Sequence, residues 1–164
     1  MPSTYEPIAT TTITSATQFI NFSSIPATYT DLRIVILSQT GGDQLVMRFN
    51  SDTGSNYSVT TMFGNGSSVN AERGTNLTFL RIGNPGSTAT NRFLFEVDIF
   101  NYAGSTLKTE LTTASLNNAG SSGSVRKTVG LWRSTAAINY VSLFNEALNF
   151  TIGDTATLYG IKNA

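Results

Sequence analysis

The chain has 164 residues, carries equal numbers of basic and acidic side chains, and contains neither cysteine nor histidine. This length fits one domain with its own apolar core. The balanced charge argues against a nucleic-acid partner, which calls for a basic excess, and the missing cysteine excludes disulfides and thiolate metal sites.

Short segments in which apolar and polar residues alternate make up most of the chain. Phe93, Phe95 and Val97, for example, alternate with mostly polar neighbours, and this period of two is typical of strands with one face in a core. The run from Leu32 to Leu37 is apolar almost throughout, as expected of a central strand. In chain order, the predicted strands span residues 5–14, 17–22, 32–37, 44–50, 57–63, 77–82, 92–99, 107–116, 125–133, 140–144 and 157–161.

Turn-forming residues separate these segments. Gly, Asn, Asp, Ser and Pro tolerate positive φ or favour a bend. About ten short strands joined by such turns predict an all-β fold, an antiparallel β-sandwich that is jelly-roll-like, as a single domain over residues 8–164. Residues 1–7, with two prolines, are expected to form a short extended N-terminal arm, and residues 134–139 one turn of helix. The turn residues gather at 41–43, 52–56, 65–66, 84–86, 103–105 and 120–123.

The composition lacks the side chains that most often carry out catalysis. Without histidine a Ser-His-Asp triad is impossible within the chain. One acidic pair remains, because Glu96 and Asp98 fall on the same face of a predicted strand, ~7 Å apart, a spacing compatible with glycoside hydrolysis. Two charges on a solvated strand face, meeting Arg33 or Lys108 on a neighbouring strand, explain the same residues more simply. We therefore expect no enzymatic activity and no cofactor.

A possible cation site lies in the segment 50–57, which gathers oxygen ligands around Gly54 as calcium loops do. Only one carboxylate, that of Asp52, is present, and the spacing of an EF-hand is not met. A strand-joining turn with hydrogen bonds from the Asp and Asn side chains is the favoured interpretation, so no metal ligands are assigned.

Most aromatic residues occupy inward strand positions and are expected in the core. Tyr57, Phe63, Tyr102 and Tyr140 lie near turns, where an exposed ring could stack on a sugar or pack against a partner subunit. Packing in the core or beneath a turn is still favoured for each of them. The aromatics expected in the core are Phe19, Phe22, Phe49, Phe93, Phe95, Trp132, Phe144 and Phe150.

Several segments, taken in order, resemble a known family. Together they are similar to small virion structural proteins of tailed phages, notably of cyanophages and marine phages, and the resemblance covers nearly the whole chain. The segments are Phe22–Leu32, Met47–Asn50, Asp52–Ser58, Gly64–Ser67, Gly130–Ile138 and Leu158–Ile161.

This resemblance implies a part of the virion with no active site. Because the family module stands almost alone here, we expect a capsid decoration (cement) protein that binds the outer shell and bridges subunits of the major capsid protein, as a homotrimer. The predicted shell contact is the N-terminal arm, with Pro2, Tyr5 and Pro7 as its partner-binding residues, since prolines lower the ordering cost and a tyrosine can anchor. A frayed terminus is the alternative interpretation of the same residues.

The start of the chain lacks a secretory signal, and no run reaches the ~18–20 apolar residues of a membrane helix. We therefore expect synthesis in the host cytoplasm, a final place on the capsid exterior, and no membrane or nucleic-acid partner. The alternative function is a tail fibre or tail tip module, whose loops 64–74 and 117–124 would recognise a host surface glycan or protein. A carbohydrate-degrading enzyme that uses Glu96 and Asp98 is a third, less favoured hypothesis.

Overall fold

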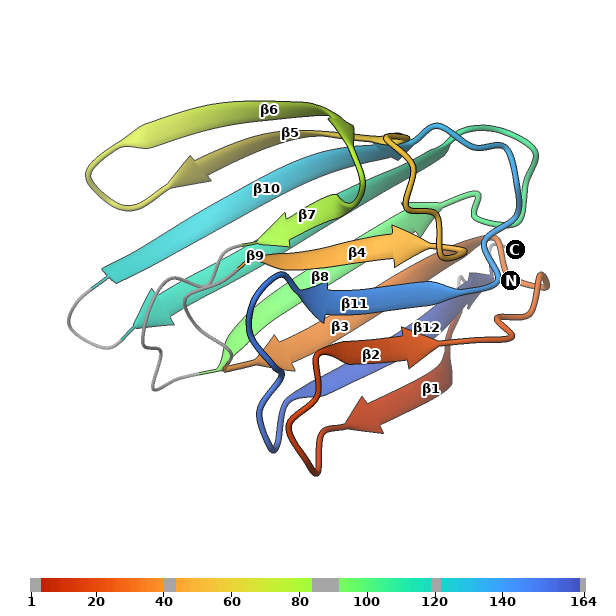
Figure 1. The fold of residues 1–164 in the computed structure, drawn as a ribbon, viewed down its shortest axis with the longest axis horizontal. Helices are drawn as coiled ribbons and strands as arrows, with labels where there is room; N and C mark the ends of the chain where they lie inside the picture. The colour runs from red at the N-terminus through yellow and green to blue at the C-terminus, as the bar shows by residue number, and fades with distance from the viewer. Residues whose placement is uncertain (1–3, 40–43, 84–91, 119–121, 163–164) are drawn as a thin grey trace.

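The computed structural model describes residues 4–39, 44–83, 92–118 and 122–162, and these form two packed antiparallel sheets without a helix (Figure 1). The strands, in chain order, are β1 (Thr4–Thr12), β2 (Phe19–Phe22), β3 (Asp31–Ser38), β4 (Leu45–Phe49), β5 (Tyr57–Gly64), β6 (Val69–Leu77), β7 (Leu80–Gly83), β8 (Phe93–Phe100), β9 (Lys108–Asn118), β10 (Ser122–Trp132), β11 (Val141–Asn145) and β12 (Thr155–Lys162).

The two sheets are unequal in size. The larger has eight strands in the order β1-β12-β3-β8-β9-β10-β5-β6, and the smaller has four in the order β2-β11-β4-β7. The small sheet covers the middle of the large one, and β1 and β6 form the outer edges of the large sheet (Figure 1). The prediction of an all-β antiparallel sandwich is confirmed, whereas the jelly-roll arrangement remains a prediction.

The core lies between the sheets and follows the predicted alternation. In β8, Phe93, Phe95, Val97 and Ile99 are buried, while the residues between them reach the opposite face. The central strand β3 alternates in the same way, so its near-continuous apolar sequence fills the core on one face only. Its other face therefore presents apolar side chains to solvent, which matters for the surfaces described below.

The residues predicted to form an extended N-terminal arm are described in part. Residues 1–3, including Pro2, lie outside the described residues, and Thr4 to Pro7 form the first half of β1, where they pair with β12. A β-bulge follows Pro7. Proline fits here because an outermost strand needs no amide hydrogen bond on its open side.

Two predictions need correction. Residues 69–74, expected to be part of a loop, lie in β6, which pairs with β5 through a turn built on Asn65. The Asn65 side chain accepts hydrogen bonds from the amides of Ser67 (3.0 Å) and Ser68 (2.8 Å), and Gly66 takes a positive φ of 87°. The helical turn expected at 134–139 is absent, and this segment is an irregular connection with Ile138 buried.

Candidate functional site

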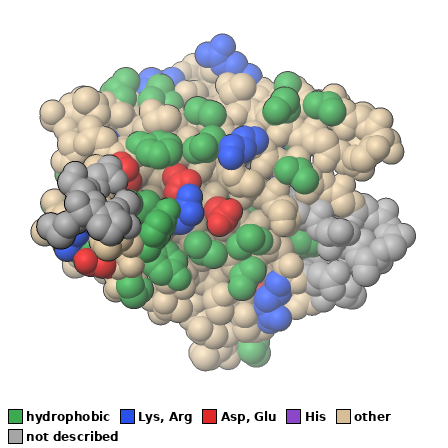
Figure 2. Space-filling view, turned by 180° about the vertical axis from the view of Figure 1, so that it is seen from behind, with side chains coloured by type: hydrophobic (Ala, Val, Ile, Leu, Met, Phe, Trp, Pro, Cys, Tyr) green, Lys and Arg blue, Asp and Glu red, His purple; other side chains and the backbone are tan. Residues whose placement is uncertain are grey.

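The outer face of the eight-stranded sheet, here called the broad face, carries an unusual share of exposed apolar side chains. Seven of the eleven large apolar side chains that are exposed in the described part of the chain lie on it, which sets it apart from the rest of the surface. Figure 2 looks onto this face and shows hydrophobic side chains spread across it. The seven are Tyr5, Leu37, Met62, Val69, Phe100, Val125 and Val129.

A small group of charges lies near the middle of the broad face (Figure 2). Arg33 of β3 donates from Nε and Nη2 to the two carboxylate oxygens of Asp98 on β8, at 2.6 and 2.8 Å. This confirms the expected meeting with Arg33 and commits Asp98 to a two-pronged ion pair. Glu96 lies on the same face, one alternation along β8. Neither carboxylate lines either of the two hollows described below or a third one at residues 16, 39, 151 and 152.

Lys108, the other proposed partner of these carboxylates, points the opposite way. Its ammonium is buried between the sheets and donates to the carbonyl oxygens of Gly104 (2.6 Å), Thr106 and Thr135 (3.3 Å). Burial lowers the pKa of Lys108. The prediction that Lys108 meets these carboxylates was therefore wrong. Its hydrogen bonds instead link the connection after β8 to the connection after β10.

A buried acid that the sequence pattern did not indicate lies on β9. Glu110 of β9 lies between the sheets, where Thr112 donates to its Oε2 (2.6 Å) and its Oε1 has no partner among the described residues. Burial raises the pKa of Glu110 to about 8, against the lowering effect of the Thr112 hydrogen bond. Gly130 stands directly opposite, and a Cβ there would lie 2.6 Å from Leu80 and closer still to the Glu110 carboxylate. The glycine therefore makes the space that the acid occupies.

The oxygen-rich loop after β4 is a structural turn. The Asp52 carboxylate accepts hydrogen bonds from the Trp132 indole (2.7 Å), the Gly54 amide (2.8 Å) and the Asn56 side chain (3.0 Å). Although burial alone would raise it, these bonds lower the pKa of Asp52. No group of three or more acidic side chains able to hold a metal occurs among the described residues. The favoured turn interpretation therefore fits the geometry of Asp52.

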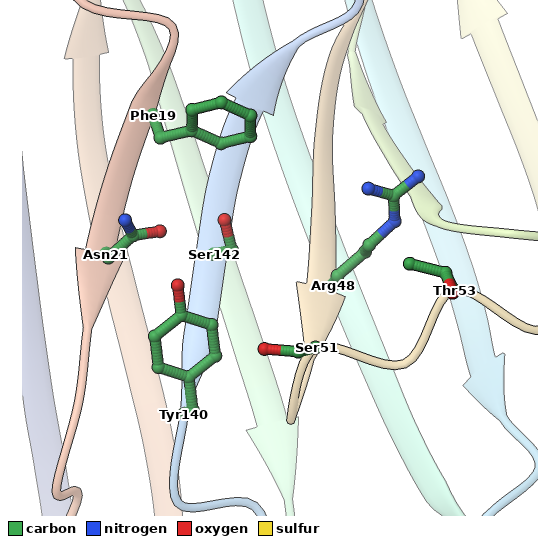
Figure 3. A pocket seen from close by; sticks show the side chains of 7 residues that line it. All are labelled: Phe19, Asn21, Arg48, Ser51, Thr53, Tyr140 and Ser142. Atoms are coloured by element: carbon green, nitrogen blue, oxygen red, sulfur yellow. The ribbon is translucent and has the colours of Figure 1, made fainter.

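A shallow hollow of about 310 Å³ opens on the outer face of the four-stranded sheet, opposite the broad face. Its floor is a row of three side chains across neighbouring strands, since Ser142 of β11 pairs with Asn21 of β2 on one side and Arg48 of β4 on the other. Figure 3 shows the two aromatic rings on opposite sides of this row, with Phe19 above it and Tyr140 below it in that view. We call this site the small-sheet hollow; Ser51 and Thr53 complete its lining.

The turn after β4 positions one side of the small-sheet hollow. Asn50 and Ser51 both take positive φ, 50° and 57°, in the left-handed region where asparagine is better tolerated than most residues. The Asn50 side chain donates to the Ala137 carbonyl (2.8 Å) and accepts from the amides of Asn139 (3.0 Å) and Tyr140 (3.2 Å). These bonds hold the backbone of the segment that leads into β11, including that of Tyr140.

Arg48 is held in place on the other side of the hollow. Its Nε donates to the Thr78 carbonyl (2.9 Å), and its guanidinium carbon lies 4.5 Å from the centre of the Phe144 ring. Phe19 packs on the same ring, with centres 5.6 Å apart. Phe19 was expected in the core but lies on this outer face with 44% of its surface exposed, because the inward positions of the short strand β2 are Ile20 and Phe22.

The residues predicted to contact a partner lie at the edge of the large sheet and at a second hollow. Tyr5 is exposed on the broad face, where the Arg33 guanidinium lies 5.4 Å from its ring centre, and Pro7 is exposed at the sheet edge. A second hollow, of about 440 Å³, is lined by residues of both predicted receptor loops, among them Gly66 and Ser124. Of the other aromatics near turns, Tyr57 and Tyr102 are fully buried, as favoured.

Comparison with known proteins gives no relative: no family model, no curated protein and no solved structure matches the chain. Among the described residues, no helix long and apolar enough to cross a membrane occurs. Function is therefore inferred from the two surfaces of the sandwich, the broad face and the small-sheet hollow.

Proposed function

We propose that the protein is a structural component of a tailed-phage virion, a decoration protein that docks onto the outer capsid shell and bridges neighbouring subunits of the major capsid protein. The resemblance of its segments to small virion proteins supports the setting, and the broad face supports the mode of action. In this proposal the protein makes and breaks no covalent bond. It acts by binding the assembled shell, which gains the binding free energy of each copy.

The observation that carries the proposal is the concentration of exposed apolar side chains on the broad face. Soluble proteins rarely leave a large contiguous apolar surface without a partner. Eight strands spaced by ~4.8 Å, with about eight residues of ~3.3 Å each, span about 1,000 Å². A stable interface needs about 800 Å² from each partner. The broad face is therefore large enough to dock on a protein shell without help from a free arm.

The test replaces apolar side chains of this face and measures binding to particles that lack the protein. Val125→Lys and Met62→Lys introduce charge at positions that are 65% and 58% exposed, so both variants should fold. We expect each to weaken particle binding at least tenfold, since an unpaired charge would be buried on docking. Ile152→Lys is the matched control, because Ile152 is 69% exposed but lies in the turn before β12.

Wild-type binding by Val125→Lys and Met62→Lys would contradict docking through this face. The homotrimer proposed for the docked state is tested on the same particles, by imaging the arrangement of copies on the shell.

The alternative location is the tail, as a fibre or tip module that recognises a host glycan or protein. The small-sheet hollow favours this alternative, because it offers aromatic rings and polar groups to a ligand outside the virion. Copy number separates the two locations: hundreds of copies spread over the head indicate decoration, and a few dozen or fewer at the tail indicate receptor binding.

A further inference from the structure

The small-sheet hollow holds several polar side chains that the fold itself does not use. In the described part of the chain, the side chains of Asn21, Ser142 and Tyr140 make no hydrogen bond, and the same is true of Ser51. Figure 3 shows the Asn21 amide, the Ser142 hydroxyl and the Tyr140 hydroxyl directed toward a common space. An amide and hydroxyl groups together offer both donors and acceptors, which is what a ligand rich in hydroxyl groups requires.

Two aromatic rings frame the same space. Phe19 is exposed and packs against Phe144 on the neighbouring strand, and Tyr140 is half-buried, with its backbone amide bonded to Asn50. A ring that is held in place and open on one side can pack against the apolar C–H face of a sugar at little cost in conformational entropy. The volume of about 310 Å³ lies at the lower end of the ~300–1,000 Å³ of small-ligand sites, which suits one or two sugar rings.

The charge of the hollow indicates which class of hydroxyl-rich ligand it would bind. Arg48 is the one charged residue that lines it, and within the described residues no carboxylate forms an ion pair with that guanidinium. Its Nε donates to the Thr78 carbonyl, while its terminal nitrogens have no hydrogen-bond acceptor among the residues that the structure describes. A guanidinium fixed at one end presents planar donors that match a carboxylate.

We propose that the small-sheet hollow binds a uronic-acid saccharide. A sugar ring packs on Phe19 and Tyr140, its hydroxyls bond to Asn21, Ser142 and the Tyr140 hydroxyl, and its carboxylate lies on Arg48. The site lies on the sheet opposite the broad face, so it remains open when the broad face is docked (Figures 1 and 3). The inference does not depend on the location of the protein in the virion.

Titration of the ¹⁵N-labelled full chain tests the site, with trigalacturonate and a glucuronic-acid trisaccharide as probes and cellotriose as the neutral control. We expect amide shifts confined to β2, β4, residues 50–53 and residues 140–145, with the uronides bound more tightly than cellotriose. Tyr140→Phe should weaken uronide binding about fivefold, the cost of one hydrogen bond, and Phe19→Ala about tenfold through lost ring packing. Arg48→Gln should abolish the preference over cellotriose. Tyr159→Phe, on the broad face, is the matched control and should bind like the wild type.

Absence of shifts in these strands with both uronides would overturn the proposal, and so would binding unaffected by Phe19→Ala and Tyr140→Phe. Equal affinity for cellotriose and the uronides would overturn the role of Arg48 and with it the ligand class. The same variants are expected to bind particles normally. Loss of sugar binding in them therefore reports on the hollow alone, and failed docking of the Val125→Lys variant reports on the broad face alone.

Discussion

Burying an ionisable side chain removes it from water and disfavours its charged form, and Glu110 is the clearest case in this protein. Its carboxyl group is buried with one oxygen lacking a partner, and burial raises its pKa to about 8 from an ordinary value of 4.5. The folded protein therefore holds a proton on Glu110 that the unfolded chain releases between these two pH values. Since the folded state binds more protons in this window, the free energy of unfolding must fall as pH rises from about 4.5 to 8.

We predict that Glu110→Gln removes most of this pH dependence, because the amide carries no charge to desolvate. The wild type should lose on the order of a few kcal/mol of stability between pH 5 and 8, and the variant much less. Denaturant unfolding at several pH values measures the difference. Glu146→Gln, at an exposed position, is the control and should follow the wild type. Parallel pH profiles for Glu110→Gln and the wild type would contradict the raised pKa.

Residue positions could be predicted from sequence where alternation is unbroken, and less well elsewhere. Phe93, Phe95 and Trp132 are buried as expected. Phe19 was misplaced because a four-residue strand that is apolar at three positions gives no clear phase. Glu110 lies in an inward phase, but a charged residue at such a position predicts an outward face unless the opposing Gly130 is taken into account. The glycine opposite the acid was the signal that could have found it.

At the scale of elements, the two strands that differ from expectation are the outer edges of the large sheet. β6 has almost no buried side chain, so its sequence carries no apolar alternation and only its pairing with β5 identifies it. β1 carries Pro7 at a position where a central strand would exclude it, and the two prolines of residues 1–7 predicted an extended arm there. Edge strands are specified by one neighbour instead of two, and local sequence reflects them weakly.

The pairing of β1 leads to a prediction about the first residues. Removing residues 1–7 should expose the edge of β12 and delete the ion pair between Glu6 and Lys162 (3.2 Å) along with the contact of Tyr5 and Arg33. We expect a loss of about 1–3 kcal/mol in unfolding free energy, measured by thermal and denaturant melts. A variant lacking only residues 1–3 is the control, since β1 begins at Thr4. If the variant lacking residues 1–7 melts at the same temperature and denaturant concentration as the full chain, the pairing of residues 4–7 with β12 contributes no stability.

At the scale of the whole molecule, the sandwich separates two surfaces of different chemistry. The broad face is large and carries seven exposed apolar side chains, and the hollow on the opposite sheet is small and combines two aromatic rings with polar side chains. Alternation within each strand predicted that outward faces exist, but not that the outward face of the large sheet is rich in Val, Met and Leu. Nor could sequence alone bring Asn21, Arg48 and Ser142 into one row, since that row depends on the pairing of three strands that lie far apart along the chain.

The balanced charge of the molecule and the apolar character of the broad face predict how docking responds to salt. Arg33 and Asp98 neutralise each other within the face, and the remaining charges include both signs, among them Glu96 and Lys127. Association steered by opposite net charges weakens steeply with ionic strength, whereas association through buried apolar area does not. We therefore expect the affinity for particles to change less than about threefold between 50 mM and 500 mM NaCl.

Sedimentation of labelled protein with particles across this salt series measures the effect. An Arg33→Ala variant supplies an internal comparison, because it leaves Asp98 without its ion-pair partner and removes one positive charge from the broad face. Its affinity should now vary with salt in a way that the wild type's does not, since an unbalanced charge at the interface is screened by ions. A wild-type affinity that falls tenfold or more over the series would mean that charge, and not apolar burial, drives the contact, and the broad face would then be the wrong surface.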